Sequence, residues 1–132
     1  MRASVLTADG VYLVDLEDSS VLGPAATADF DPAPEPPSPP FLPRLVAASG
    51  VGSTVVAVVD TRPPLAVSHD AGRTWRESGR GLPPGRAVAV SQDNPDHVLF
   101  ATGDRLYVST DGGRFWRGLE AELPEIDAVA WA

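Results

Sequence analysis

An eight-residue motif occurs twice in this chain. The stretch SHDAGRTW, Ser68–Trp75, is followed by STDGGRFW, Ser109–Trp116, at an interval of 41 residues (Ser68 to Ser109). The flanking residues also correspond, because RLVAAS from Arg44 matches RAVAVS from Arg86. A repeat of this length is typical of a supersecondary unit that stacks on its neighbours to bury a shared core. The repeat therefore restricts the chain to folds that are built from stacked copies of one unit.

Each repeat has the pattern of four short strands separated by turn-forming residues. The strands of one copy are RLVAAS, TVVAVV, LAVS and RTWRES, and those of the next are RAVAVS, HVLFAT, RLYVS and RFWRGL. Four strands in about 41 residues correspond to one blade of a β-propeller. We predict an all-β protein made of four-stranded propeller blades.

The two ends of the chain contain the parts of one further blade. The C-terminal stretch DAVAWA matches RAVAVS, so it is a third copy of a first strand. The N-terminal stretch SVLTADGVYLVD matches VLFATGDRLYVS, and SSVLGP supplies a weak fourth strand. We therefore predict three blades per chain, permuted by one strand. The expected parts are blade 1 at 1–23, a Pro-rich loop insertion at 24–43, blade 2 at 44–85, blade 3 at 86–126 and an inner strand at 127–132.

The repeated octets resemble the Asp-box, or BNR repeat, of the sialidase and sortilin-like propeller superfamily. An Asp carboxylate in such a turn accepts backbone N–H groups, a Gly adopts positive φ, and a Trp buries its ring beneath the hairpin. The resemblance implies a propeller fold without a particular chemistry, because this family includes sialidases, other glycoside hydrolases, sorting receptors and photosystem assembly factors. It also implies that the boxes lie away from the binding face. The structural Asp-box residues are Ser68, Asp70, Gly72, Trp75, Ser109, Asp111, Gly113 and Trp116.

Three blades alone leave two sheet faces without a neighbour and expose unpaired strand edges, which soluble proteins avoid. Propellers typically have about four to eight blades. We therefore predict a homodimer that closes a six-bladed ring, in which residues 127–132 of each chain complete blade 1 of the partner chain. The alternative is closure with another partial propeller.

Charge and composition exclude several classes of partner. A formal net charge of −8 argues against binding to nucleic acid or to an anionic membrane. The absence of cysteine excludes disulfides and thiolate sites. The start of the chain lacks the apolar segment of a signal peptide, and no uninterrupted apolar run of 18 residues occurs, so we expect a cytoplasmic protein. His69 and His97 are isolated in the sequence, and we expect neither a metal site nor a cofactor.

The most plausible ligand site is the face that carries the interblade loops, opposite the octets. Arg44, Arg86 and Asp127 occupy aligned positions just before the three first strands. A mixed ring of charges at the channel mouth is suited to a carboxylate, a phosphate or a sugar, although it is also typical of a solvated rim. The candidate ligand-binding residues are Arg44, Arg86, Asp127, Arg62, Asp104 and Arg105.

We predict no catalytic residue and interpret the chain as a binding or scaffold module for a protein or glycan ligand. The adjacent Ser68, His69 and Asp70 do not form a catalytic triad, because neighbouring residues of a strand point to opposite faces. The alternatives are a sialidase-like glycoside hydrolase or a carbohydrate-binding lectin acting at the channel mouth. A hydrolase would use Glu122 or Glu125 with Asp127, since two suitably spaced carboxyls suffice for the reaction. A purely structural subunit is a third class.

The Pro-rich loop favours extended polyproline II conformation. The P-x-x-P pattern at Pro34–Pro37 is suited to binding by an aromatic-grooved domain. The alternative interpretation is a stiff loop that lies over a face or reaches across the dimer, with Phe30 and Phe41 as anchors.

Overall fold

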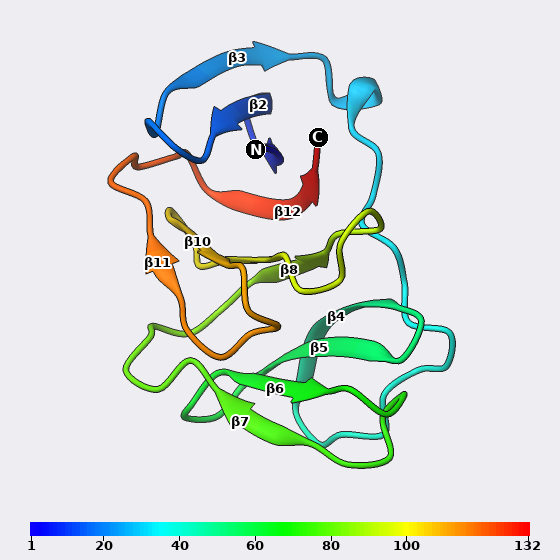
Figure 1. The fold of residues 1–132 in the computed structure, drawn as a ribbon. Coiled ribbons are helices and arrows are strands. Elements are labelled where there is room, and N and C mark those ends of the chain that lie inside the picture. The colour runs from blue at the N-terminus through cyan, green and yellow to red at the C-terminus, as the bar shows by residue number, and fades with distance from the viewer.

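The computed structural model describes residues 1–132, and its strands form three separate four-stranded antiparallel sheets (Figure 1). The chain has no α-helix and a single 3-10 turn, η1 (Thr27–Asp29). Each sheet has the strand number and order of a propeller blade. The prediction of an all-β chain with three four-stranded, strand-permuted blades is confirmed. No helix in the structure has the length and apolar character that crossing a membrane requires.

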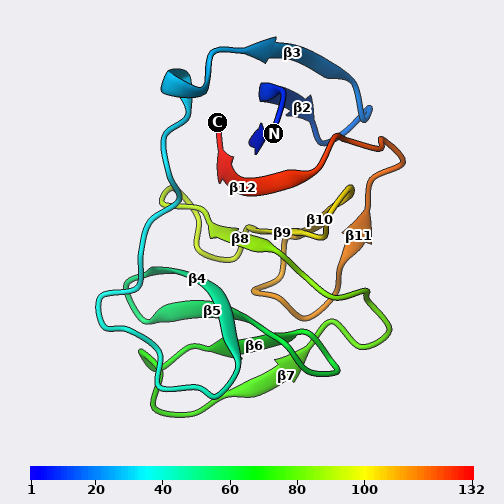
Figure 2. The same ribbon diagram turned by 180° about the vertical axis from the view of Figure 1, so that it is seen from behind.

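The first blade combines both ends of the chain in the order β12-β1-β2-β3. Its N-terminal hairpin continues into an exposed outer strand, and its inner strand comes from the C-terminus, so that both ends of the chain lie side by side (Figures 1 and 2). Its strands are β1 (Arg2–Thr7), β2 (Gly10–Asp15), β3 (Val21–Ala25) and β12 (Ile126–Trp131).

The pairing of β12 corrects one prediction from the sequence. Residues 127–132 were expected to complete the blade of a partner chain, but β12 pairs with β1 of its own chain, from Ala3 opposite Trp131 to Thr7 opposite Ile126. The physical reason is the long segment between β3 and β4, which allows the N-terminal strands to reach the side of the third blade on which β12 lies. The strand β12 therefore makes its sheet hydrogen bonds within its own chain.

The second and third blades each follow the chain in simple meander order. The strands of the second blade are β4 (Leu45–Val51), β5 (Thr54–Val59), β6 (Leu65–Ser68) and β7 (Arg76–Ser78). The strands of the third blade are β8 (Ala87–Val90), β9 (Val98–Ala101), β10 (Leu106–Ser109) and β11 (Arg117–Gly118). In both blades the first strand is innermost, as the repeat alignment predicts.

The third blade lies between the other two, and the inner strand β8 packs against both β4 and β12 (Figure 2). One core lies between the first and third blades, where Leu16, Leu99 and Ile126 are fully buried. A second core lies between the second and third blades around Phe100 and Val58. Burial of such side chains stabilises each by about 1.5–3 kcal/mol relative to exposure, so the seams between blades hold the fold together. The first and second blades each keep one face without a neighbouring blade.

The two octets form the same hydrogen-bonded turn in the second and third blades. The Asp70 carboxylate accepts the Ser68 hydroxyl at 2.8 Å and the Thr74 backbone N–H at 2.9 Å. The Asp111 carboxylate accepts the Ser109 hydroxyl at 2.7 Å in the equivalent position. The turns require left-handed backbone at Gly72 (φ 90°) and at Gly113 (φ 88°), where a residue with a side chain would be strained. The sequence therefore encodes these turns locally.

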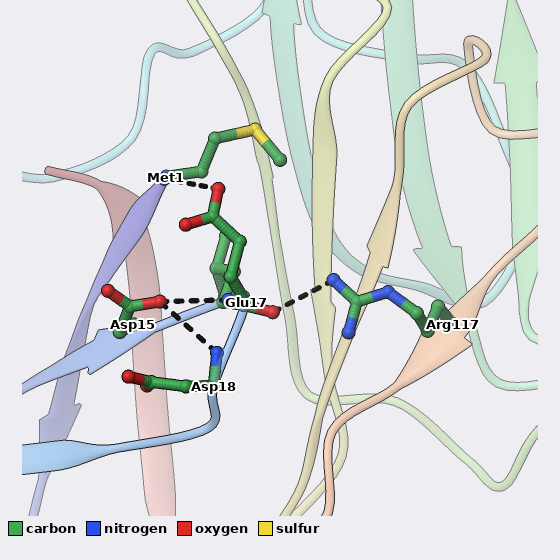
Figure 3. A network of polar contacts seen from close by, with 6 residues as sticks. Met1, Asp15, Glu17, Asp18 and Arg117 are labelled. Carbon is green, nitrogen blue, oxygen red and sulfur yellow. Dashed lines mark hydrogen bonds and ion pairs between the residues drawn. The ribbon is translucent and has the colours of Figure 1, made fainter.

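In the first blade, a different turn replaces the octet and locks the seam to the third blade. Figure 3 shows that the Asp15 carboxylate accepts the backbone N–H groups of Glu17, at 2.9 Å, and Asp18, at 3.3 Å. The Arg117 guanidinium of β11 crosses the seam and donates to the carbonyl oxygen of Leu16 at 2.8 Å. Leu16 itself is fully buried, so this turn is fixed by packing as well as by hydrogen bonds.

The Pro-rich segment first lies along the inner edge of β4, close to the third blade, and then reaches the face of the second blade that has no neighbouring blade. The Gly50 N–H of β4 donates to the carbonyl of Pro34 at 3.1 Å, and the Ser49 hydroxyl donates to the same oxygen at 2.7 Å. Farther along, Leu42 and Pro43 line a cavity of about 220 Å³ with Trp75 and other residues of that face. Phe41 is fully exposed, so it does not anchor this segment within the chain, and its role across a dimer stays a prediction. The carbonyl of Pro34 and the side chains of Leu42 and Pro43 contact the second blade instead.

Candidate functional site

The loop face is formed by the turns between second and third strands together with the connections between blades. In the third blade the β9–β10 turn lies beside the β11–β12 connection, because the Leu123 N–H donates to the Asp104 carbonyl at 2.9 Å. The Ile126 N–H donates to the Gly103 carbonyl at 2.9 Å in the same region. In the second blade the β5–β6 turn and the β7–β8 connection line a common cavity. Loops from different parts of the sequence thus form one surface.

Charges on the third-blade side of this face are paired within the chain. Arg105 from the β9–β10 turn contacts Glu122 of the β11–β12 connection at 3.0 Å. Arg86 contacts Glu125 at 3.0 Å and Asp127 at 3.8 Å. These are exposed ion pairs, which typically contribute about 0–1 kcal/mol each to stability. Their main consequence is that these guanidinium and carboxylate groups are already partnered.

The second-blade side has a different charge arrangement. A cavity of about 520 Å³ is bounded by Arg62 of the β5–β6 turn and Arg80 of the β7–β8 connection. Neither guanidinium takes part in a hydrogen bond or an ion pair within the chain. Pro63, Pro83 and Pro84 line the cavity as well, and proline restricts the backbone of both loops. The cavity therefore presents two free cationic groups from stiff loops.

The six ligand-binding residues expected from the sequence do not form one common cluster of contacts. Arg86 and Asp127 come together as an ion pair, and Arg105 pairs with a residue outside the expected set. Arg44 donates to the Asp60 carbonyl at 3.4 Å. The Asp104 carboxylate accepts the Thr102 hydroxyl at 3.5 Å, and Arg62 lines the second-blade cavity. The ligand-binding role of these six residues remains a prediction.

Arg80 was not among the residues singled out from the sequence. The aligned connections SGRGLPPGR and RGLEAELPEID contain the signal that would have identified it. When Leu82 is placed over Leu123, Arg80 and Gly81 stand where the third blade has Ala121 and Glu122. The second blade thus has an additional arginine and lacks the acid that pairs with Arg105 in the third blade.

The carboxylates proposed for glycosidase chemistry lie on the exposed surface. Glu122 and Glu125 are bound to arginines, and their side chains are 69% and 66% exposed. A raised-pKa acid normally requires an apolar environment. A sialidase-like enzyme would also need a tyrosine nucleophile at this face. Tyr107 instead packs against Phe100, with ring centroids 5.8 Å apart, inside the third blade. The geometry of this face therefore favours recognition of a charged group.

The blade order, the seams and the loop face define a class of protein, the partial β-propeller with three blades in one chain. A scan against models of protein families finds no match, and no curated protein matches the chain. Among solved structures, the one described as YCF48 bound to D1 peptide aligns at 19% identity with a TM-score of 0.49. The alignment covers 90% of this chain and 39% of that chain, so this chain spans well under half of its length. The propeller assignment depends on the sheets and repeats described above.

Proposed function

We propose that this chain is a non-enzymatic binding or scaffold module of the Asp-box propeller type, and that its loop face binds an anionic group of a protein or glycan ligand. One observation carries this proposal. Equivalent loops of neighbouring blades hold Arg105 paired with Glu122 in one case, and unpaired Arg62 and Arg80 in the other. Where the acid is missing, the ligand supplies it.

The chemistry of the cavity supports this proposal. Guanidinium groups bind carboxylates and phosphates through charge-assisted, often bidentate hydrogen bonds. Two uncompensated cations on a chain of net charge −8 form a local positive site in a negative surface. Such a site selects an anion locally while the rest of the surface repels extended polyanions. The proline-rich lining reduces the entropy lost when the loops are ordered by a ligand.

The site is tested by calorimetric titration with inorganic phosphate and with glucuronic acid, a sugar that carries a carboxylate. Arg62→Gln and Arg80→Gln should each weaken binding by roughly tenfold, since one charged hydrogen bond contributes about 1.5–3 kcal/mol. Arg2→Gln on the first blade is the matched control, with the same change in charge. Equal weakening by the control would contradict a specific site. Hydrolysis of fluorogenic glycosides that is lost in Glu122→Gln or Glu125→Gln would establish the glycosidase alternative.

We further propose that two copies of the chain close a six-bladed ring through the blade faces that have no neighbour. The first blade exposes Leu22, which is 66% accessible, and the second exposes Leu45 and Val46. Because β12 stays in its own chain, closure depends on packing of the open blade faces of the two chains against each other. The Pro-rich segment would lie between these faces. Light scattering after size exclusion should give a dimer mass that Leu22→Asp reduces to the monomer mass. A monomeric native chain would favour closure with a different partial propeller.

We also propose a cytoplasmic setting. The chain lacks cysteine and so gains nothing from an oxidising compartment. Fractionation of cells that express the native protein tests this directly, and recovery from the extracellular medium would contradict it.

A further inference from the structure

A second cavity adjoins the Arg62–Arg80 cavity and runs along the outer edge of the second blade. It measures about 460 Å³ and lies between β7 and the octet of the third blade. Arg80 belongs to both cavities, so the two form one continuous surface from the loop face toward the octet face. We call this surface the arginine groove. Its charged and aromatic lining residues are Arg62, Arg80, Arg76, Arg114, Glu77 and Phe115.

The arginine groove has an excess of positive charge that the chain does not neutralise. Four arginines face one glutamate, and none of the four guanidiniums takes part in an ion pair or a hydrogen bond within the chain. The ion pairs formed by arginine elsewhere in the chain involve Arg86 and Arg105 on the third-blade side of the loop face. Holding several like charges together without counter-charges costs free energy, which an anionic ligand would offset.

The floor of the groove is rigid. The Ser78 hydroxyl of β7 donates to the Gly113 carbonyl and accepts the Trp116 Nε1–H at 3.0 Å. These bonds hold the edge of the second blade against the octet of the third blade. Phe115, the neighbour of Trp116, is 78% exposed at the rim of the groove and offers an apolar contact. The groove is thus a preformed site with four cationic groups and one aromatic ring.

The strand next to the groove points to the kind of ligand. β7 is the outermost strand of its sheet and pairs only with β6, so its other edge has no strand partner. A free strand edge binds an extended polypeptide through main-chain hydrogen bonds, and side-chain sites beside it give specificity. Neither nucleic acid nor a free phosphate uses such an edge. The net charge of −8 also disfavours a long polyanion.

We propose that the arginine groove binds an extended acidic segment of a partner protein, which adds to the free edge of β7 and places its carboxylates on the arginines. This inference rests on the proposed function, because Arg80 belongs to both sites. It extends that function by naming the ligand as polypeptide and by including Arg76, Arg114 and Phe115 as contacts. In a strand, alternate residues point the same way, so a segment with an acid at every second position fits best.

Fluorescence anisotropy with labelled ten-residue peptides tests this proposal on the full chain. One library has Glu or Asp at alternate positions with apolar residues between them, a second has Gln and Asn instead, and dT10 serves as the nucleic acid probe. The acidic library should bind and the amide library should not. Arg80→Gln and Arg114→Gln should each weaken binding by roughly tenfold, and Arg2→Gln should leave it unchanged. Methylation of alternate backbone nitrogens of the peptide should abolish binding if a strand is added to β7.

The outcomes separate this inference from the proposed function. If phosphate binding requires Arg62 and Arg80 but peptide binding is absent or insensitive to Arg114→Gln and Arg76→Gln, the peptide groove is wrong and the anion site stands. If neither Arg62→Gln nor Arg80→Gln affects any anionic probe, the proposed function fails as well. Tighter binding of dT10 than of the acidic peptides would overturn the choice of polypeptide. Circular dichroism of each variant verifies that its sheets are intact.

Discussion

The Ser78 hydroxyl of β7 lies in hydrogen-bond contact with the indole of Trp116, whose Nε1–H donates to it at 3.0 Å across the seam between two blades. The same hydroxyl donates to the carbonyl of Gly113, in the octet that contains the indole. One serine therefore satisfies a donor and an acceptor of the neighbouring blade. The octet is a local turn that also provides the lock between blades.

Ser78→Ala should lower the free energy of unfolding by about 1–3 kcal/mol, because it leaves the Trp116 N–H and the Gly113 carbonyl without partners in a partly buried seam. Urea unfolding followed by tryptophan fluorescence measures the change. Ser53→Ala is the control, since Ser53 is exposed in a turn and its side chain makes no hydrogen bond. Equal stability of the two variants would show that the lock has no energetic role.

The octet aspartates should make stability depend on acid pH. The Thr74 hydroxyl, the Thr74 N–H and the Ser68 hydroxyl hold the pKa of Asp70 well below its usual value. Burial alone would raise the pKa of Asp111, but hydrogen bonds from Phe115, Ser109 and Arg114 outweigh it and lower the pKa. A carboxylate with a depressed folded-state pKa stabilises the fold above its unfolded pKa of about 4, and the contribution is lost as pH falls through the folded value.

Asp70→Asn isolates this effect. The native chain should be more stable than the variant at pH 6, and the difference should shrink as pH falls below about 4 because protonation removes the carboxylate from the native chain. Thermal unfolding between pH 6 and pH 2.5 follows the difference. Asp93→Asn, in an exposed turn, should show no such convergence with the native chain. A constant gap between native chain and Asp70→Asn at every pH would contradict the assignment.

The two octets differ at one strained position, which allows a stabilising substitution. Ala71 has φ 62°, and its counterpart Gly112 has φ 76°. Left-handed backbone costs a residue with a Cβ about 1–2 kcal/mol, part of which is offset because glycine gains freedom in the unfolded chain. Ala71→Gly should raise the free energy of unfolding by roughly 0.5–1 kcal/mol in urea titration. The reverse change, Gly112→Ala, should lower it, since its Cβ would lie 3.2 Å from the His69 ring.

The inner strand β12 should stabilise its own chain independently of protein concentration. The Trp131 Nε1–H donates to the Ala89 carbonyl of β8 at 3.0 Å, which ties the first blade to the third. Trp131→Phe keeps the apolar ring and removes this bond, so it should cost about 1 kcal/mol. Unfolding midpoints measured over a hundredfold range of protein concentration should show the same loss throughout. A loss that grows on dilution would indicate that β12 completes a blade of a partner chain.

Several features followed from local sequence because their causes are local. Short apolar runs bounded by turn-forming residues predict the strands, and the octet positions Asp70 and Gly72 predict a self-supporting turn with left-handed backbone. The repeat interval predicted four-stranded blades, and the surplus first strand at the C-terminus predicted the permutation. The strands and turns depend on residues close together in the chain, and the blade size and the permutation depend on the repeat, which is itself a sequence pattern, so the sequence by itself determined them.

Other features depended on which distant segments meet in space. The length of the Pro-rich segment permits β1 to reach the β12 strand of its own chain, and strand pairing alone does not distinguish that partner from a second copy. Arg80 shares a cavity with Arg62 because two loops converge, whereas the corresponding loops of the next blade bring Arg105 to Glu122. Charge pairing depends on where side chains from separate loops lie, and no local pattern specifies that. The tertiary structure therefore decided which arginines are neutralised and which are free to bind a ligand.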